Sequence, residues 1–277
     1  MMYEHPGAGA LNYFPCRYGN SKLMFRGPRR RLEGVFCAMT GGTETYGKFV
    51  KTPFPALVEE LTGHRIVNLG CANAGPDIFS GEAAVLTLCA PARVTVVQVL
   101  GAQNMSNRFY AVHPRRNDRF LRASPQLKAL FPEVDFTEFH FTRHMLTTLK
   151  TVSLRKFAAV EAELKTAWVA RLKSLTAPLA GASVLLHVTG VGSRGFADGG
   201  LGPEPLFVDD AMVAEVAPGF SETVRVRASA AAVARGTEGM VFSPLEEPAA
   251  MALPGPEVHA EIAAALAPAI DRFMGPA

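Results

Sequence analysis

Short runs of apolar and β-branched residues alternate along this chain with segments in which apolar positions recur every three to four residues. The runs predicted to form strands are Gly34–Thr40, Arg65–Leu69, Val94–Leu100, Ser183–Val188 and Thr223–Val226. The segments predicted to form helices are Tyr46–Leu61, Ile78–Cys89, Leu154–Leu175 and Val258–Phe273. Because strand, crossover helix and strand form a parallel unit, the pattern predicts an α/β protein of three-layer α/β/α architecture with a mostly parallel central sheet.

Two long polar segments interrupt this alternation. Gly101–Pro125 and Gly190–Pro205 have little apolar surface to bury, so both are predicted to be loops, which in compact domains are commonly functional or disordered. Glu138–His144 alternates aromatic and polar residues, as a half-buried strand or the wall of a site would. The sequence contains no internal repeat, so residues 1–277 are predicted to form one domain with a basic N-terminal extension over about residues 1–33.

Composition narrows the class of protein. Apolar residues make up 48% and charged residues 19% of the 277 residues, which is usual for a globular protein, and no apolar stretch is long enough to cross a bilayer. Met1–Pro15 lacks the basic and apolar parts of a secretory signal, so a cytoplasmic protein without a membrane partner is expected. The four cysteines are widely spaced, and His140 and His144 have no evident third ligand, so neither a metal nor a cofactor is expected.

The basic residues are unevenly distributed. A net charge of +3 is too small to suggest a nucleic-acid binder. Two clusters stand out: the first is Arg17, Lys22, Arg26, Arg29, Arg30 and Arg31, and the second is Arg108, Arg115, Arg116, Arg119 and Arg122. Either cluster could hold a phosphate or a carboxylate. Either could instead be a solvated basic face, and the second could be an ion-pair network that anchors a long loop.

Polar loops follow the first three predicted strands. The carboxyl ends of parallel strands meet at one edge of an open sheet, which is where such folds bind their ligands. The three loops are Gly41–Lys48, Asn68–Gly75 and Gly101–Asp118, and each contains glycine together with hydrogen-bonding side chains. The sequence therefore predicts one shared site at this edge, suited to an anion.

The first of these loops resembles the nucleophile turn of the SGNH or GDSL hydrolase superfamily. That superfamily has Gly-Asp-Ser-x-Thr-x-Gly after its first strand, and this chain has GGTETYG over residues 41–47. The resemblance implies a flavodoxin-like or SGNH-like fold, with Thr43 in the position of the nucleophilic serine and Thr45 among the substrate-binding residues. The aspartate of the motif is replaced by Gly42.

The same resemblance implies the rest of a catalytic site. Oxyanion donors are expected at Gly75, with Asn73 beside it, and at Gln103 or Asn104, because fixed N–H dipoles stabilise developing negative charge. The superfamily's Asp-x-x-His before its last helix corresponds to PEVH here, which implies that His259 is the general base and that proline replaces the aspartate. His113, His140 and His144 are competing bases.

The chain as a whole is similar to an uncharacterised bacterial family known only as a domain of unknown function. The segments that carry the likeness are Cys16–Ser21, Phe25–Arg30, Gly41–Lys48 and Ser106–Asp118. This likeness covers nearly the full length. It implies no particular activity.

Gly42–Phe49 also resembles a P-loop, with a lysine after its second glycine. Phe49 stands where a P-loop needs serine or threonine to hold Mg²⁺, and the third predicted strand ends without the usual metal-holding aspartate. Nucleotide hydrolysis is therefore not favoured, although backbone amides at the start of a helix could still hold a phosphate.

Three functional hypotheses follow. The first is an SGNH-like esterase or acyltransferase acting on an anionic substrate, such as an acidic saccharide, through Thr43 and His259. The residues predicted to bind that substrate are Thr45, Asn73, Arg108, His113, Arg115, Arg116, Asn117 and Asp118. The second is a degenerate domain that binds an anionic ligand or partner without turnover, in which Thr43 caps a helix. The third is sulfo or phosphoryl transfer. The sequence leaves the oligomeric state open.

Overall fold

The computed structural model describes residues 11–191 and 200–276. Five strands form its central sheet in the order β2-β1-β3-β6-β7, and every neighbouring pair is parallel. The strands are β1 (Cys37–Gly41), β2 (Ile66–Gly70), β3 (Val94–Gln98), β6 (Ala182–Thr189) and β7 (Glu222–Arg227). All five predicted strands and the parallel sheet are confirmed. The order of these strands along the sheet is the flavodoxin-like one, with its switch point between β1 and β3.

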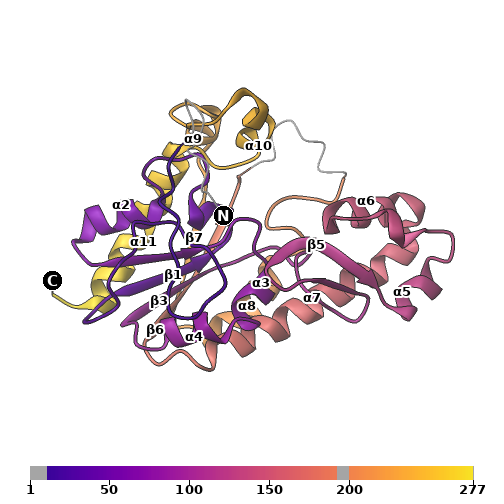
Figure 1. Cartoon of the computed structure of the whole chain (residues 1–277), viewed down its shortest axis with the longest axis horizontal. Helices are drawn as coiled ribbons and strands as arrows, with labels where there is room; N and C mark the ends of the chain where they lie inside the picture. Colours follow the sequence, from indigo (N-terminus) through magenta and orange to yellow (C-terminus); the bar gives the residue numbers. More distant parts are fainter. Residues whose placement is uncertain (1–10, 192–199, 277) are drawn as a thin grey trace.

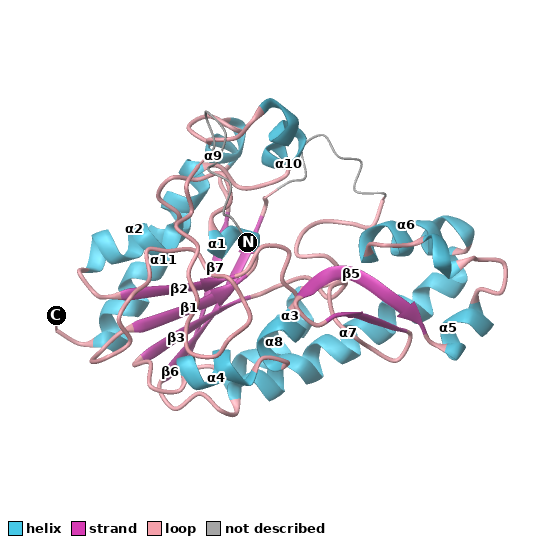
Figure 2. Cartoon of the chain, viewed as in Figure 1, coloured by secondary structure: helices cyan, strands magenta, loops and turns pink. Residues whose placement is uncertain are grey.

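Helices cover both faces of this sheet, which confirms the three-layer architecture (Figure 1). The helices are α1 (Thr43–Tyr46), α2 (Phe54–Thr62), α3 (Pro76–Ser80), α4 (Ala83–Cys89), α5 (Pro125–Leu130), α6 (Thr142–Val152), α7 (Leu154–Thr176), α8 (Asp210–Val216), α9 (Ala230–Ala234), α10 (Glu247–Met251) and α11 (Pro256–Met274), with 3₁₀ turns η1 (Phe136–Glu138), η2 (Ala217–Gly219) and η3 (Pro244–Glu246). Helices α2 and α11 pack together on one face, whereas α3, α4, α7 and α8 lie on the other (Figure 2).

The burial of the strands explains why their sequences are almost continuously apolar. Every residue of β1 and of β3 is buried, as expected for parallel strands covered on both faces. Side chains alternate between two hydrophobic cores, since Cys37 and Met39 join the core under α11 whereas Ala38 joins the core under α7. Helices α7 and α11 contain the two predicted helices Leu154–Leu175 and Val258–Phe273.

The other two predicted helices are each broken in two. The Tyr46–Leu61 segment is divided between α1 and α2 because Gly47 adopts a left-handed conformation (φ 73°) that ends α1, and α2 begins only after Pro53. The Ile78–Cys89 segment is divided between α3 and α4 near Gly81. Both predicted helices were too long for the same reason. The helical spacing of apolar residues continues across residues at which a helix ends, so the pattern alone did not show the break.

The prediction of a loop over Gly101–Pro125 was wrong in its second half. Strands β4 (Tyr110–His113) and β5 (Arg116–Ala123) form an antiparallel hairpin there. The buried positions of β5 do not alternate regularly and are separated by charged residues, and its pairing with β4 is irregular, so composition suggested a loop. The strand alternative for Glu138–His144 was also wrong, since η1 and the start of α6 occupy it. Of the second predicted loop, Gly190–Pro205, residues 192–199 lie outside the described part of the chain.

A buried arginine of the N-terminal segment binds α1 and the loop that follows it. The Arg26 guanidinium donates hydrogen bonds to the backbone carbonyls of Tyr46, Gly47, Val50 and Lys51, so it fixes the segment that follows α1. This first-cluster arginine is therefore fully used by the fold and is not available to an anion. Residues 1–10 of the predicted extension lie outside the described residues. Within residues 11–191 and 200–276, no helix combines the length and apolar character needed to cross a membrane.

Candidate functional site

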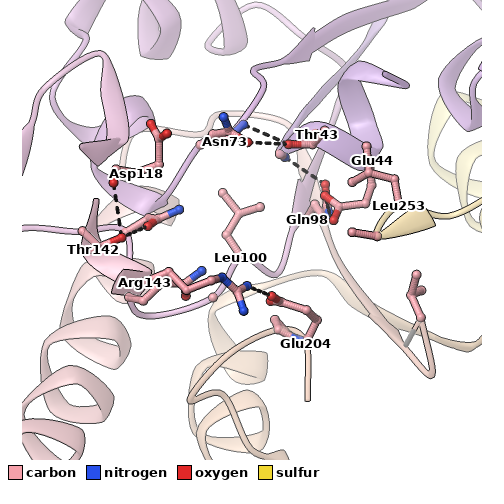
Figure 3. Close-up of a pocket in the computed structure, with 18 of the residues that line it drawn as sticks. Thr43, Glu44, Asn73, Gln98, Leu100, Asp118, Thr142, Arg143, Glu204 and Leu253 are labelled. Atoms are coloured by element: carbon pink, nitrogen blue, oxygen red, sulfur yellow. Dashed lines mark hydrogen bonds and ion pairs between the residues drawn. The ribbon is translucent and has the colours of Figure 1, made fainter. Parts of the chain in front are cut away.

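A cavity of about 650 Å³ lies at the carboxyl ends of β1, β2, β3 and β6, the edge at which the sequence predicted a site. Its volume is within the roughly 300–1,000 Å³ that is usual for small-molecule sites. Figure 3 shows Glu44 and Gln98 on one wall, Asp118 and Thr142 on the opposite wall, and Leu100 between them. The lining therefore combines polar side chains with apolar ones, which include Leu100, Pro205 and Leu253.

Glycines allow the turn after β1 to pack tightly against its neighbours. A Cβ atom at Gly41 would lie 1.9 Å from the Thr45 hydroxyl oxygen, and one at Gly70 would lie 2.3 Å from the backbone nitrogen of Tyr46. No side chain fits at such distances, so only glycine lets α1 approach both β1 and β2 this closely. The position of Thr43 and Glu44 at the cavity depends on this approach.

Gln98, the last residue of β3, organises this turn. Its side-chain oxygen accepts hydrogen bonds from the backbone N–H of Gly42 (2.9 Å) and from the hydroxyl of Thr45 (2.6 Å). Because a backbone N–H can only donate, the amide orientation is determined, and its nitrogen must face Glu44, to which it donates at 3.0 Å. Gln98 thus links β3 to three successive parts of the turn.

Glu44 places an unusual carboxyl group in the cavity. Desolvation by burial raises the pKa of Glu44, the hydrogen bond from Gln98 opposes this rise, and the charge of Glu204 adds to it. Asp118 is a second carboxyl group on the cavity wall whose pKa burial raises. The cavity therefore holds two carboxyl groups that bind protons more readily than exposed carboxylates do.

The hydroxyl of Thr43 is engaged by the loop after β2. It accepts a hydrogen bond from the backbone N–H of Asn73 at 2.9 Å and donates to the side-chain oxygen of Asn73 at 3.5 Å. Asn73 can turn back in this way because it adopts a left-handed conformation, with φ at 56°. Among the described residues no histidine, aspartate or glutamate forms a hydrogen bond with the Thr43 hydroxyl.

The loop after β3 is held by the core, and its side chains are directed to the cavity. The indole N–H of Trp168 donates to the carbonyl of Leu100 (2.7 Å), and the hydroxyl of Tyr110 donates to the carbonyl of Gln103 (2.7 Å). The side-chain oxygen of Asn104 accepts a hydrogen bond from Thr142 (2.7 Å). Gln103 and Asn104 both line the cavity. Core residues therefore hold the backbone of the loop after β3, while its amide side chains remain at the site.

The start of α6 and the segment before α8 complete the wall. Phe141, Thr142, Arg143 and His144 line the cavity, which agrees with the alternative that Glu138–His144 forms a site wall. Arg143 forms an ion pair with Glu204, so the guanidinium that faces the cavity is already paired. The wall also carries the carboxyl groups of Glu44 and Asp118. Among the described wall residues, carboxyl groups therefore outnumber guanidinium groups, and the electrostatics of this part of the wall do not favour an anion.

The structure places His259 and Gly75 away from the roles that the resemblance implied. The His259 ring is fully buried against Phe54, whose backbone N–H it accepts at 3.1 Å, and desolvation lowers its pKa to about 3. His259 does not line the cavity. The backbone N–H of Gly75 donates to the side chain of Asn117 (3.0 Å), so it is not free to stabilise an oxyanion.

The predicted arginine cluster lies outside the cavity wall, as does His113. Arg108 forms an ion pair with Glu163 of α7 (2.9 Å), which supports the reading that this cluster anchors its loop. Arg115 and Arg116 are exposed where β4 turns into β5.

Asn117 is fully buried and ties the hairpin to the loop after β2. Thr45, within α1, is buried and donates its hydroxyl hydrogen bond to Gln98. Of the predicted site residues, the cavity brings together Thr43, Asn73, Gln103, Asn104 and Asp118.

Sequence reasoning missed several wall residues, among them Glu44, Gln98, Arg143 and Glu204. One signal was available for Gln98, because a lone amide at the end of an otherwise apolar strand is expensive to bury without partners. Glu44 lay inside a recognised loop but was read only as part of a turn. Arg143 and Glu204 are 61 positions apart, so no local pattern could pair them.

Comparison with known proteins assigns the chain to one family. A family model described as a domain of unknown function (DUF6473) matches residues 1–274. No curated protein matches the sequence. The comparisons therefore support the similarity to an uncharacterised family. They give no support to the resemblance to SGNH hydrolases.

Proposed function

The chain belongs to the family of domains of unknown function DUF6473, and from that premise we propose that it binds a small, neutral, hydroxyl-rich ligand of the saccharide class in the cavity at the carboxyl edge of its sheet. Binding does not involve covalent attack by Thr43. The observation that carries this proposal is the wall itself, in which amide and carboxyl side chains are interspersed with apolar ones.

The chemistry of the wall matches that of a hydroxyl group. A hydroxyl both donates and accepts hydrogen bonds, so it can pair with either end of an amide and with a carboxyl group in either protonation state. Asn73, Asn104 and the carboxyl groups of Glu44 and Asp118 offer such partners. The two carboxyl groups lie on opposite sides of the cavity (Figure 3). Leu100 and Leu253 supply apolar surface for the C–H faces of a sugar ring.

Two observations favour binding over the esterase hypothesis. A hydroxyl nucleophile needs a base within hydrogen-bond reach, whereas the Thr43 hydroxyl bonds to Asn73 alone among the described residues. The N–H of Gly75, which an oxyanion would need, is bonded to Asn117. The anionic ligand that the basic clusters suggested is less favoured, because among the described wall residues Arg143 is paired and Glu44 and Asp118 carry carboxyl groups.

The test compares neutral and acidic sugars of similar size. Ligand-observed saturation-transfer NMR would be recorded with glucose, galactose and mannose, and with glucuronate and galacturonate. We expect transfer to at least one neutral hexose. We expect it to disappear in Ala252→Trp, which fills the cavity, and to persist in Ala129→Trp, an exposed position of α5 outside the cavity.

Reactivity provides the second arm. Incubation with a fluorophosphonate probe is expected to leave Thr43 unlabelled. Labelling that disappears in Thr43→Val would overturn the proposal in favour of the esterase. Saturation transfer to a uronate without transfer to any neutral hexose would favour the anionic-ligand hypothesis instead. No transfer to any of the five sugars would refute the saccharide proposal.

A further inference from the structure

Gln103 is a buried amide that the fold does not use. The residue is only 8% exposed, its side-chain oxygen has no hydrogen-bond partner, and it lines the cavity. Its backbone carbonyl is bonded to Tyr110, so the unpaired group belongs to the side chain alone. Buried polar groups are nearly always hydrogen-bonded in folded proteins, and an exception in a ligand cavity indicates a group reserved for a ligand.

The local structure leaves this amide free to turn. Its oxygen rests against Gly101, where a Cβ atom would lie 2.2 Å from it, so glycine is what makes room for the side chain. No hydrogen bond with a described residue would be lost if the amide rotated toward the cavity.

The backbone beneath Gln103 is rigid by contrast. The N–H of Ala102 donates to the carbonyl of Leu206 (2.9 Å), Trp168 donates to the carbonyl of Leu100, and Tyr110 donates to the carbonyl of Gln103 itself. Because the backbone is already fixed, a ligand has to order only the side chain of Gln103, which limits the conformational freedom lost on binding.

We infer that Gln103 is a specificity-determining residue that reads one hydroxyl of the bound saccharide. This inference rests on the proposed function. A hydroxyl is the group that satisfies the amide in either orientation, since it can donate to the oxygen or accept from the nitrogen. A sugar that lacks this one hydroxyl leaves the buried amide unpaired and binds more weakly.

The first test needs no ligand. In Gln103→Met an apolar side chain of similar size replaces the unpaired amide, so the urea midpoint of the free protein is expected to rise. Gln126→Met, at an exposed position of α5, is the matched control and should leave the midpoint unchanged. A fall in the midpoint of Gln103→Met would show that the amide stabilises the fold, and would overturn the inference.

The second test uses the hexose that gives the strongest transfer and its monodeoxy analogues. In the wild type, one analogue should bind about tenfold more weakly than the parent sugar, the equivalent of one hydrogen bond. In Gln103→Met, that analogue and the parent should bind equally, because the group that distinguished them is absent.

The outcomes separate the two proposals. If the wild type binds no hexose, the proposed function fails. If the wild type binds a hexose but Gln103→Met retains the same discrimination among analogues, only the role of Gln103 fails.

Discussion

Replacing Gln98 with leucine is expected to destabilise the protein by about 2–4 kcal/mol, because one side chain holds three parts of the turn after β1. The variant removes the acceptor of the Gly42 N–H and of the Thr45 hydroxyl, and the donor to Glu44. A buried group left without its partner costs about 1–3 kcal/mol. Thr45 and Glu44 can rotate to new partners, whereas the backbone N–H of Gly42 cannot.

The assay is urea unfolding followed by tryptophan fluorescence. Trp168 is the only tryptophan in the sequence and is fully buried, so its emission reports exposure of the core. The loss is smaller than the roughly 5–15 kcal/mol of a typical domain, so the variant should still fold. Thr40→Val is the control, since it removes a single buried hydrogen bond to Val96 (3.1 Å) and should cost about 1 kcal/mol.

The comparison decides whether Gln98 organises the site. If Gln98→Leu loses no more stability than Thr40→Val, the three hydrogen bonds do not act together and the reasoning is wrong. If it loses more, the same variant should also weaken hexose transfer, because Glu44 and Thr43 are positioned by the turn that Gln98 holds.

Three other substitutions should each change the stability of the protein in a way that follows from the burial or hydrogen bonding of the residue replaced. The pKa of His259 is about 3 because its ring is buried, so the contribution of this neutral ring to wild-type stability should be lost as the pH drops from about 6.5 toward 3. Urea midpoints of His259→Leu should therefore depend less on pH over this range than those of the wild type. The same pH dependence in both proteins would contradict the prediction. Burial raises the pKa of Glu44, so the contribution of this carboxyl group to stability is lost as the pH rises through that pKa, and the urea midpoint of the wild type should fall relative to that of Glu44→Gln over this range. Asn117→Ala leaves the N–H of Gly75 unpaired and should cost about 1–3 kcal/mol in the same titration, whereas a loss near zero would mean that water replaces the amide.

Much of the fold was readable from local pattern. The runs around Cys37–Gly41 and Val94–Gln98 are buried on both faces, so their apolar character is nearly continuous and identifies them as parallel strands. The errors occurred where local signals competed. Gly47 ended a helix that apolar spacing extended, and the charged face of Arg116–Ala123 concealed a strand.

Some of the residues at the site could likewise be predicted from the sequence, and others could not. Thr43, Asn73 and Gln103 follow directly after strands, so their place at the carboxyl edge followed from topology alone. His259 did not follow this rule, because it lies within the first turns of α11 and its ring packs under α2. Arg108 is on the loop after β3, but its guanidinium forms an ion pair with Glu163 of α7 and does not line the cavity.

By itself the sequence determined the parallel sheet and the edge at which the cavity forms, because hydrophobic periodicity and strand ends are properties of neighbouring residues. Only the tertiary structure decided which polar side chains are consumed by the fold and which remain for a ligand. Arg26, Asn117 and Thr45 find partners in the protein, whereas the amide of Gln103 finds none among the described residues. That outcome depends on contacts between segments far apart in the chain, since each hydrogen bond is made or lost according to what the rest of the fold places opposite it.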